Sequence, residues 1–152
     1  MLNTRRNTAL LMASLLLSDL ALSSEAPDLS SASYSDILNY CQKHPDNRVG
    51  GAAIGDCLAE QTEQLEHQSQ TRQTALLDNQ CPAVKLQAMI AQQQWQSYRT
   101  SQCGLYRAMF DNTPMYNNSQ ACRLQLTLDY RDQVDFLARY KPEDPQPCNA
   151  SP

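Results

Sequence analysis

The sequence predicts an all-α protein: a small, disulfide-stapled antiparallel bundle of three long helices with a short helix before them. Val, Ile and Gly are scarce, whereas Leu, Ala and Gln are abundant, which favours helix over strand. Apolar side chains recur at alternating spacings of three and four residues, the pattern of a helix packed in a bundle. Six cysteines, an even number, can staple so small a domain.

The N-terminus is typical of a bacterial secretory signal peptide. Arg5 and Arg6 precede an apolar run over 8–17, and small residues follow, so we expect cleavage after Ser23. A transmembrane anchor is the weaker interpretation, because the apolar run falls short of the ~20 residues that a span needs. We therefore expect a periplasmic or secreted protein without a stable membrane anchor, with residues 1–23 as its signal peptide.

Composition divides the remaining chain into three parts. Residues 24–33 are Ser-rich and predict a flexible lead-in, and 34–140 predict the helical domain. Residues 141–152 carry four prolines and predict a non-helical tail held by Cys148. Removal of 1–23 takes two of 12 basic and one of 16 acidic residues and leaves a net charge near −5. Such a chain is not expected to bind nucleic acid.

Four helices are expected within the domain, separated by residues that break helices. They cover about 34–43, 56–78, 83–110 and 120–140, and the first is entered through Ser35 and Asp36. The inward face of the second is half polar: Leu58, Thr62, Leu65, Ser69, Arg72 and Leu76. The third has a longer stripe: Val84, Ala88, Ala91, Trp95, Tyr98, Gln102, Leu105 and Met109. The fourth is expected to bury Leu126, Tyr130, Val134, Leu137 and Tyr140.

The topology limits how the cysteines can pair. Antiparallel long helices with short connections place Cys81 at one end of the bundle, where Cys148 is its only partner within the ~7 Å that a disulfide allows. Three pairings remain for the four cysteines at the other end. The short first helix favours Cys41 with Cys57, and Cys103 would then pair with Cys122.

We find no constellation of residues that predicts catalysis, a metal site or a cofactor. Neither His44 nor His67 is placed to act as a general base or metal ligand, and there is no C-x-x-C pair and no phosphate-binding loop. The carboxylate pairs Glu60/Glu63 and Asp132/Asp135 are interpreted as solvated helix faces. The sequence therefore predicts a protein that is not an enzyme, with no catalytic residues, no metal ligands and no cofactor.

Three segments resemble the LprI-like lysozyme inhibitor family: "DCLAEQTEQLEHQ", "QQQWQSYRTSQC" and "CRLQLTLDYRDQVDFL". The resemblance covers about 41–140, and its most specific part is Trp95 and Arg99 followed by Cys103, with Tyr98 between them. The Asp-x-x-Leu-Asn-x-x-Tyr pattern usual in the family is absent here, and Cys81 and Cys148 look like an additional pair. The family implies a small secreted bacterial helical domain, some of whose members inhibit lysozyme.

The resemblance leaves two main functional hypotheses. The first is a binding protein whose partner is a lysozyme, and the second is an envelope structural or adaptor module with an unidentified protein partner. Loops 44–55 and 111–119 would form the binding surface, with Met115 and Tyr116 as apolar contacts; alternatively these two residues cap the core of the bundle. Trp95 and Tyr98 are expected in the core. Arg99 is expected to bind a helix-end carbonyl or a carboxylate such as Asp129 or Asp132.

Overall fold

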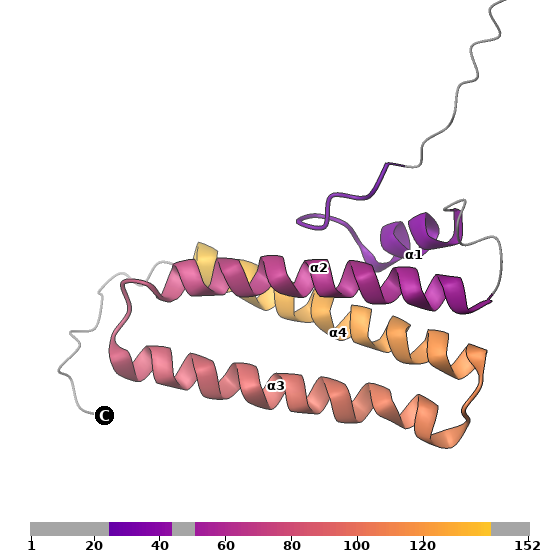
Figure 1. The fold of residues 1–152 in the computed structure, drawn as a ribbon. Coiled ribbons are helices and arrows are strands. Elements are labelled where there is room, and N and C mark those ends of the chain that lie inside the picture. The colour runs from indigo at the N-terminus through magenta and orange to yellow at the C-terminus, as the bar shows by residue number, and fades with distance from the viewer. Residues whose placement is uncertain (1–24, 44–50, 141–152) are drawn as a thin grey trace, which may run out of the picture.

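The structure, a computed structural model, describes residues 25–43 and 51–140 and contains four α-helices in them. They are α1 (Tyr34–Lys43), α2 (Gly51–Leu77), α3 (Pro82–Met109) and α4 (Thr113–Arg139). Figure 1 shows α2, α3 and α4 as long, successively antiparallel rods with α1 lying across α2. The predicted all-α, disulfide-stapled bundle is confirmed. The expected signal peptide (1–23) and tail (141–152) lie outside the described residues.

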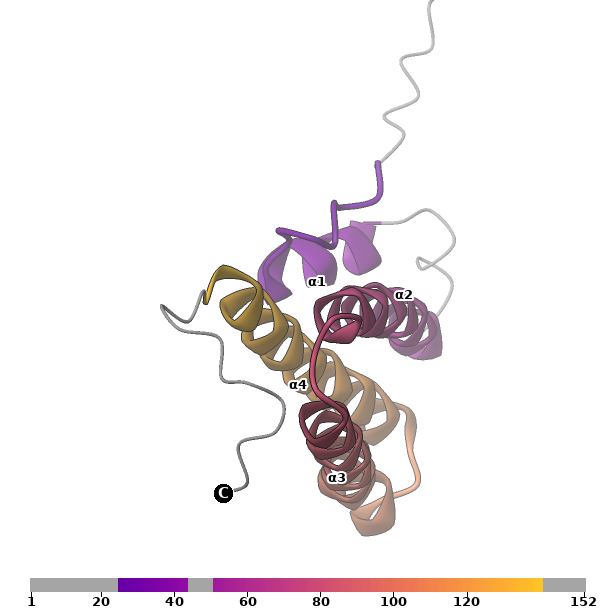
Figure 2. The same ribbon diagram turned by 90° about the vertical axis from the view of Figure 1, so that its left-hand side faces the viewer.

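The long helices are arranged around α4, which packs against both α2 and α3. In the end-on view of Figure 2, α4 lies between α2 and α3, and α1 lies on the side of α2 and α4 that is remote from α3. The main hydrophobic cluster follows this arrangement, because its members come from α1, α2, α4 and the segment before α1. They are Leu29, Ala32, Ile37, Cys41, Leu58, Leu65, Leu124 and Leu128. No residue of α3 belongs to this cluster.

The segment before α1 is packed, contrary to the flexible lead-in that we expected over 24–33. Leu29 and Ala32 are buried, and their carbonyl oxygens accept hydrogen bonds from Arg131 Nη1 at 3.1 and 2.7 Å. Ser33 then caps α1: its hydroxyl accepts from the Asp36 N–H, and the Asp36 carboxylate accepts from the Ser33 N–H. This reciprocal pair satisfies two backbone donors at the helix start.

The polar inward face of α2 is confirmed, and its hydroxyls are satisfied locally. Thr62 donates to the Leu58 carbonyl at 2.6 Å, and Ser69 donates to the Leu65 carbonyl at 2.8 Å. Each residue is buried, so the bond within its own helix removes the cost of an unpaired hydroxyl. Arg72, at the edge of this face, is exposed and forms a salt bridge with Asp135 of α4.

Two disulfides staple one end of the bundle as the sequence predicts. Cys41 pairs with Cys57 with Cα atoms 5.6 Å apart, and this bond ties α1 to α2. Cys103 pairs with Cys122 with Cα atoms 5.5 Å apart, and this bond ties α3 to α4. Cys81 precedes Pro82 at the start of α3. Its expected partner, Cys148, lies outside the described residues.

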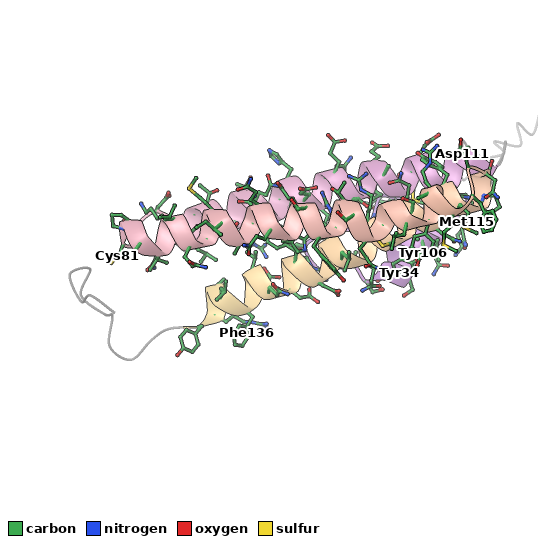
Figure 3. All side chains as sticks on the ribbon, turned by 90° about the horizontal axis from the view of Figure 1, so that it is seen from below. Tyr34, Cys81, Tyr106, Asp111, Met115 and Phe136 are labelled. Atoms are coloured by element: carbon green, nitrogen blue, oxygen red, sulfur yellow. A yellow bond between two sulfur atoms is a disulfide. The ribbon has the colours of Figure 1, made fainter. Side chains whose placement is uncertain are left out.

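The predicted inward stripe of α3 is wrong by about one residue. Val84, Tyr98, Leu105 and Met109 are 46–67% exposed. The line that faces the bundle consists instead of buried or half-buried residues that are mostly polar: Lys85, Ala88, Gln92, Trp95, Gln96, Arg99 and Cys103. The prediction of buried residues also fails at the end of the fourth helix, where Leu137 and Tyr140 are exposed. Figures 1 and 3 both show α4 diverging from α3 toward this end.

Two glycines in long helices should respond oppositely to alanine. A Cβ on Gly55 would lie 2.5 Å from Tyr116 Cε1 and from Asn117 Oδ1, whereas a Cβ on Gly104 would meet nothing within 4 Å. Gly55→Ala should therefore cost about 1–3 kcal/mol of folding free energy through overpacking, and Gly104→Ala should gain about 0.5–1 kcal/mol. Urea denaturation of both variants checks this. Equal stability of Gly55→Ala and the wild type would contradict the close approach of α2 and α4.

Candidate functional site

Arg99 occupies the centre of the bundle and contacts all three long helices. It lies on α3 and is 5% exposed. Its Nη2 forms a 2.6 Å ion pair with Glu66 Oε2 of α2, and its Nη1 donates to Thr127 Oγ1 of α4 at 2.8 Å. The expectation of a carboxylate partner is correct in kind, but that partner is Glu66 rather than Asp129 or Asp132. Both of those residues are exposed on α4.

The partners of Arg99 are themselves held in place. Glu66 Oε1 accepts from Gln70 at 3.0 Å and from Gln96 at 3.3 Å, so two further residues orient the carboxylate. Thr127 donates its own proton to the Arg123 carbonyl at 2.8 Å, which leaves a lone pair of its oxygen for Arg99. Arg99 Nε has no hydrogen-bond partner. The network is therefore well satisfied, with one donor left over.

Aromatic rings cover one side of this network. The Arg99 guanidinium carbon lies 4.5 Å from the centre of the Trp95 ring, within the range of a cation–π contact. Trp95 stacks in turn on Tyr130 of α4, with ring centres 4.4 Å apart. The Tyr130 hydroxyl donates to Gln73 Oε1 of α2 at 2.6 Å. Apart from Arg99 Nε, the polar groups of this cluster are paired with other groups of the chain, so the cluster is structural, and we call it the Arg99 clamp.

Tyr98 does not share in this cluster. It is 55% exposed, so the prediction that Trp95 and Tyr98 both lie in the core is correct only in part: Trp95 is half-buried. Tyr98 is one residue from Arg99 and points about 100° away from it around the helix. The segment quoted for the family resemblance therefore has an inward side, formed by Trp95, Arg99 and Cys103, and an outward side.

Met115 and Tyr116 lie in the first turns of α4, not in the predicted loop. The helix begins at Thr113, and Asn112 caps it by accepting a 3.0 Å hydrogen bond from the Met115 N–H. The Tyr116 hydroxyl donates to Asp56 Oδ1 of α2 at 2.6 Å, and Arg107 of α3 lies over its ring. Figure 3 shows Met115 and Asp111 together at one end of the bundle. Both predicted contact residues are half-buried.

An acidic line runs along the exposed side of α2 from this same end. Asp56, Glu60 and Glu63 follow spacings of four and three, and all three are exposed. The first 16 residues of α2 include four acidic and no basic residues. Glu60, Glu63 and His67 border a shallow hollow in the surface with Gln64 and Gln68. The sequence predicts a solvated face at Glu60 and Glu63, and nothing in it indicates that the line begins near Tyr116. The Asp56–Tyr116 bond makes that connection.

The other residues considered for chemistry are separated in the fold. Glu60 and Glu63 lie on α2, whereas Asp132 and Asp135 lie on α4 and are engaged by Arg131 and Arg72. In residues 25–43 and 51–140, no three His, Cys, Asp or Glu side chains gather so as to hold a metal ion. None of the four described helices is long and apolar enough to cross a membrane.

Comparison with known proteins adds no relative. No protein-family model, no curated protein and no solved structure matches the chain.

The clamp predicts a late-ionising tyrosine. The pKa of Tyr130 lies above 10.0 because burial disfavours the phenolate, and the charge of Glu66 adds to the shift. Because the pKa of Tyr130 is higher in the folded than in the unfolded protein, the contribution of its protonated form to folding stability is complete below pH 10. That contribution is lost as the pH rises through the folded-state pKa. In an alkaline absorbance titration of the folded protein, the phenolate signal that Tyr130→Phe removes should have its midpoint above pH 10. For the protein unfolded in concentrated urea, the midpoint of that signal should lie near pH 10. Equal midpoints in the folded and unfolded protein would contradict the burial of Tyr130.

Proposed function

We propose that this chain is a periplasmic or secreted bacterial binding protein of the LprI-like type, which inhibits a lysozyme by covering its active site. The acidic line Asp56, Glu60 and Glu63 carries the proposal, because many lysozymes are strongly basic. A carboxylate line facing a basic protein raises the association rate and orients the encounter. The disulfides Cys41–Cys57 and Cys103–Cys122 indicate an oxidising environment, which agrees with an exported protein.

The binding surface in this proposal is the N-terminal end of α2, which lies next to the start of α4. There Asp56, the first carboxylate of the acidic line, accepts a hydrogen bond from the Tyr116 hydroxyl, and Met115, next to Tyr116 in α4, is half-buried. Gly55 allows the Tyr116 ring to lie directly on α2. The surface therefore combines a fixed aromatic group with several negative charges. A rigid, disulfide-stapled surface loses little conformational entropy when it binds.

A second candidate function, an envelope structural or adaptor module, is favoured by a different observation. The outward side of α3 leaves Val84, Tyr98, Leu105 and Met109 half-exposed or more, and α3 contains no acidic residue. Such a surface is unsuited to electrostatic attraction of a basic protein. It is suited to another apolar helix.

Inhibition assays separate the two functions. We expect the purified mature protein to inhibit at least one member of a lysozyme panel, and we expect Glu60→Gln/Glu63→Gln to weaken that inhibition about tenfold or more. Asp129→Asn/Asp132→Asn is the matched control, since it also removes two exposed carboxylates three residues apart, on α4. The control should leave inhibition within about twofold of the wild type, and added salt should reduce the difference.

Two results would overturn the proposal. No inhibition of any lysozyme by micromolar protein would remove the lysozyme function and favour the structural module. Equal weakening by both double substitutions would show that overall charge, and not the acidic line of α2, governs binding.

A further inference from the structure

The end of the bundle at Cys81, which we call the open end, carries six large apolar side chains that are 46–65% exposed. They come from the first turns of α3 and the last turn of α4: Val84, Leu86, Met89, Phe136, Leu137 and Tyr140. Figure 3 shows Cys81 and Phe136 at this end of the molecule, remote from Met115 and Asp111. Apolar side chains gathered in this way mark a contact surface.

Leu137 is exposed because α4 leaves α3 before the two helices end. Trp95 of α3 stacks on Tyr130 of α4, with ring centres 4.4 Å apart. Two turns further toward the open end, continued antiparallel packing would set Ala88 of α3 opposite Leu137 of α4. Leu137 is instead 55% exposed, and Figures 1 and 3 show α4 diverging from α3 there. The packing of α3 on α4 therefore ends before it reaches Leu137.

The chain after α4 is attached on both sides of this divergence. On one side, residue 141 follows Tyr140, which caps α4. On the other side, Cys81 at the start of α3 is disulfide-bonded. The other four described cysteines pair with one another, and the sequence has one cysteine more, Cys148. Residues 141–148 reach at most ~28 Å, so a bond from Cys148 to Cys81 would carry them across the open end.

The sequence of this segment suits an extended strand with one apolar face. "KPEDPQPC" over 141–148 has three prolines in eight residues, which favours polyproline II, a helix with three residues per turn. In that conformation Pro142, Pro145 and Cys148 lie on one face, and the two acidic residues lie on the others. A Cys148 side chain that bonds Cys81 faces the bundle, so both prolines of its face point to the bundle as well.

We propose that residues 141–148 form a strap across the open end, closed by a Cys81–Cys148 disulfide. The two prolines that face the bundle cover Leu137 and the stacked rings of Phe136 and Tyr140. Pro-rich segments in the polyproline II conformation bind aromatic-lined surfaces through the same kind of contact. The strap thus supplies the apolar contact that α3 does not make with the end of α4, and the chain itself occupies this surface.

Two prolines of the strap provide a matched pair of variants. Pro145→Ser and Pro147→Ser each remove one proline, but only Pro145 lies on the face of Cys148. The equilibrium between the Cys81–Cys148 bond and its dithiol would be measured in glutathione buffers by alkylation of Cys148. Pro145→Ser should shift it about fivefold or more toward the dithiol, because docking of the strap raises the effective concentration of the two thiols. Pro147→Ser should stay within about twofold of the wild type.

The contact itself is checked by nuclear magnetic resonance. In the oxidised mature protein, nuclear Overhauser effects should join the ring protons of Pro145 to the methyl groups of Leu137. Circular dichroism should show both serine variants folded, since neither position lies in a described helix. A free Cys148 thiol in the oxidised protein, the absence of these Overhauser effects, or equal shifts in Pro145→Ser and Pro147→Ser would each overturn the strap.

Discussion

The position of α3 depends on one buried ion pair, that between Arg99 and Glu66. The hydrophobic cluster is built from α1, α2, α4 and the segment before α1, so α3 cannot be held by that core. It is held by Arg99, by the Cys103–Cys122 disulfide and by the stacking of Trp95 on Tyr130. A guanidinium removed from water requires a charged partner and further hydrogen bonds, and Glu66 and Thr127 provide them. This requirement selects one orientation of the helix.

That orientation accounts for the surface of the molecule as well as its interior. Because Arg99 and Cys103 face inward, the side chains of Tyr98 and Leu105 on α3 are exposed. The acidic line of α2 also remains in solvent, and it begins at the Asp56–Tyr116 bond. The two surfaces differ in chemistry, since one is apolar without carboxylates and the other is acidic.

The sequence predicts the elements of this fold better than their rotation. Helix spacing, prolines and cysteines place all four helices, and the ends of α1 and the pairing of Cys41 with Cys57 agree with the structure. The rotation of α3 is not predictable from apolar spacing, because its buried line is polar and the energy lies in contacts with Glu66 and Thr127 on other helices. The spacing of apolar residues predicts which side of a helix is apolar. It does not predict that the contacts of a buried arginine determine which side of α3 faces the bundle.

The candidate binding surface was predictable only in part. The sequence predicts a loop over 111–119, with Met115 and Tyr116 either as apolar contacts for a partner or as a cap on the core, whereas the structure has both residues in α4. Proline is tolerated in the first turn of a helix, where its missing N–H costs nothing, and Asn112 supplies the cap. The link between Tyr116 and Asp56 joins residues 60 positions apart. No local signal in the sequence reports such a contact.

A double-mutant cycle on Arg99 and Glu66 tests the central claim most directly. The free energy of unfolding would be measured for Arg99→Met, Glu66→Gln and the double variant, with the exposed pair Arg107–Asp111 as the reference cycle. Each single substitution at the buried pair should cost about 3 kcal/mol or more, and the double variant should lose at least ~1.5 kcal/mol less than the two costs combined. The exposed pair should show coupling of no more than ~0.5 kcal/mol. Additive losses at Arg99 and Glu66 would contradict the account, because α3 would then be held without their ion pair.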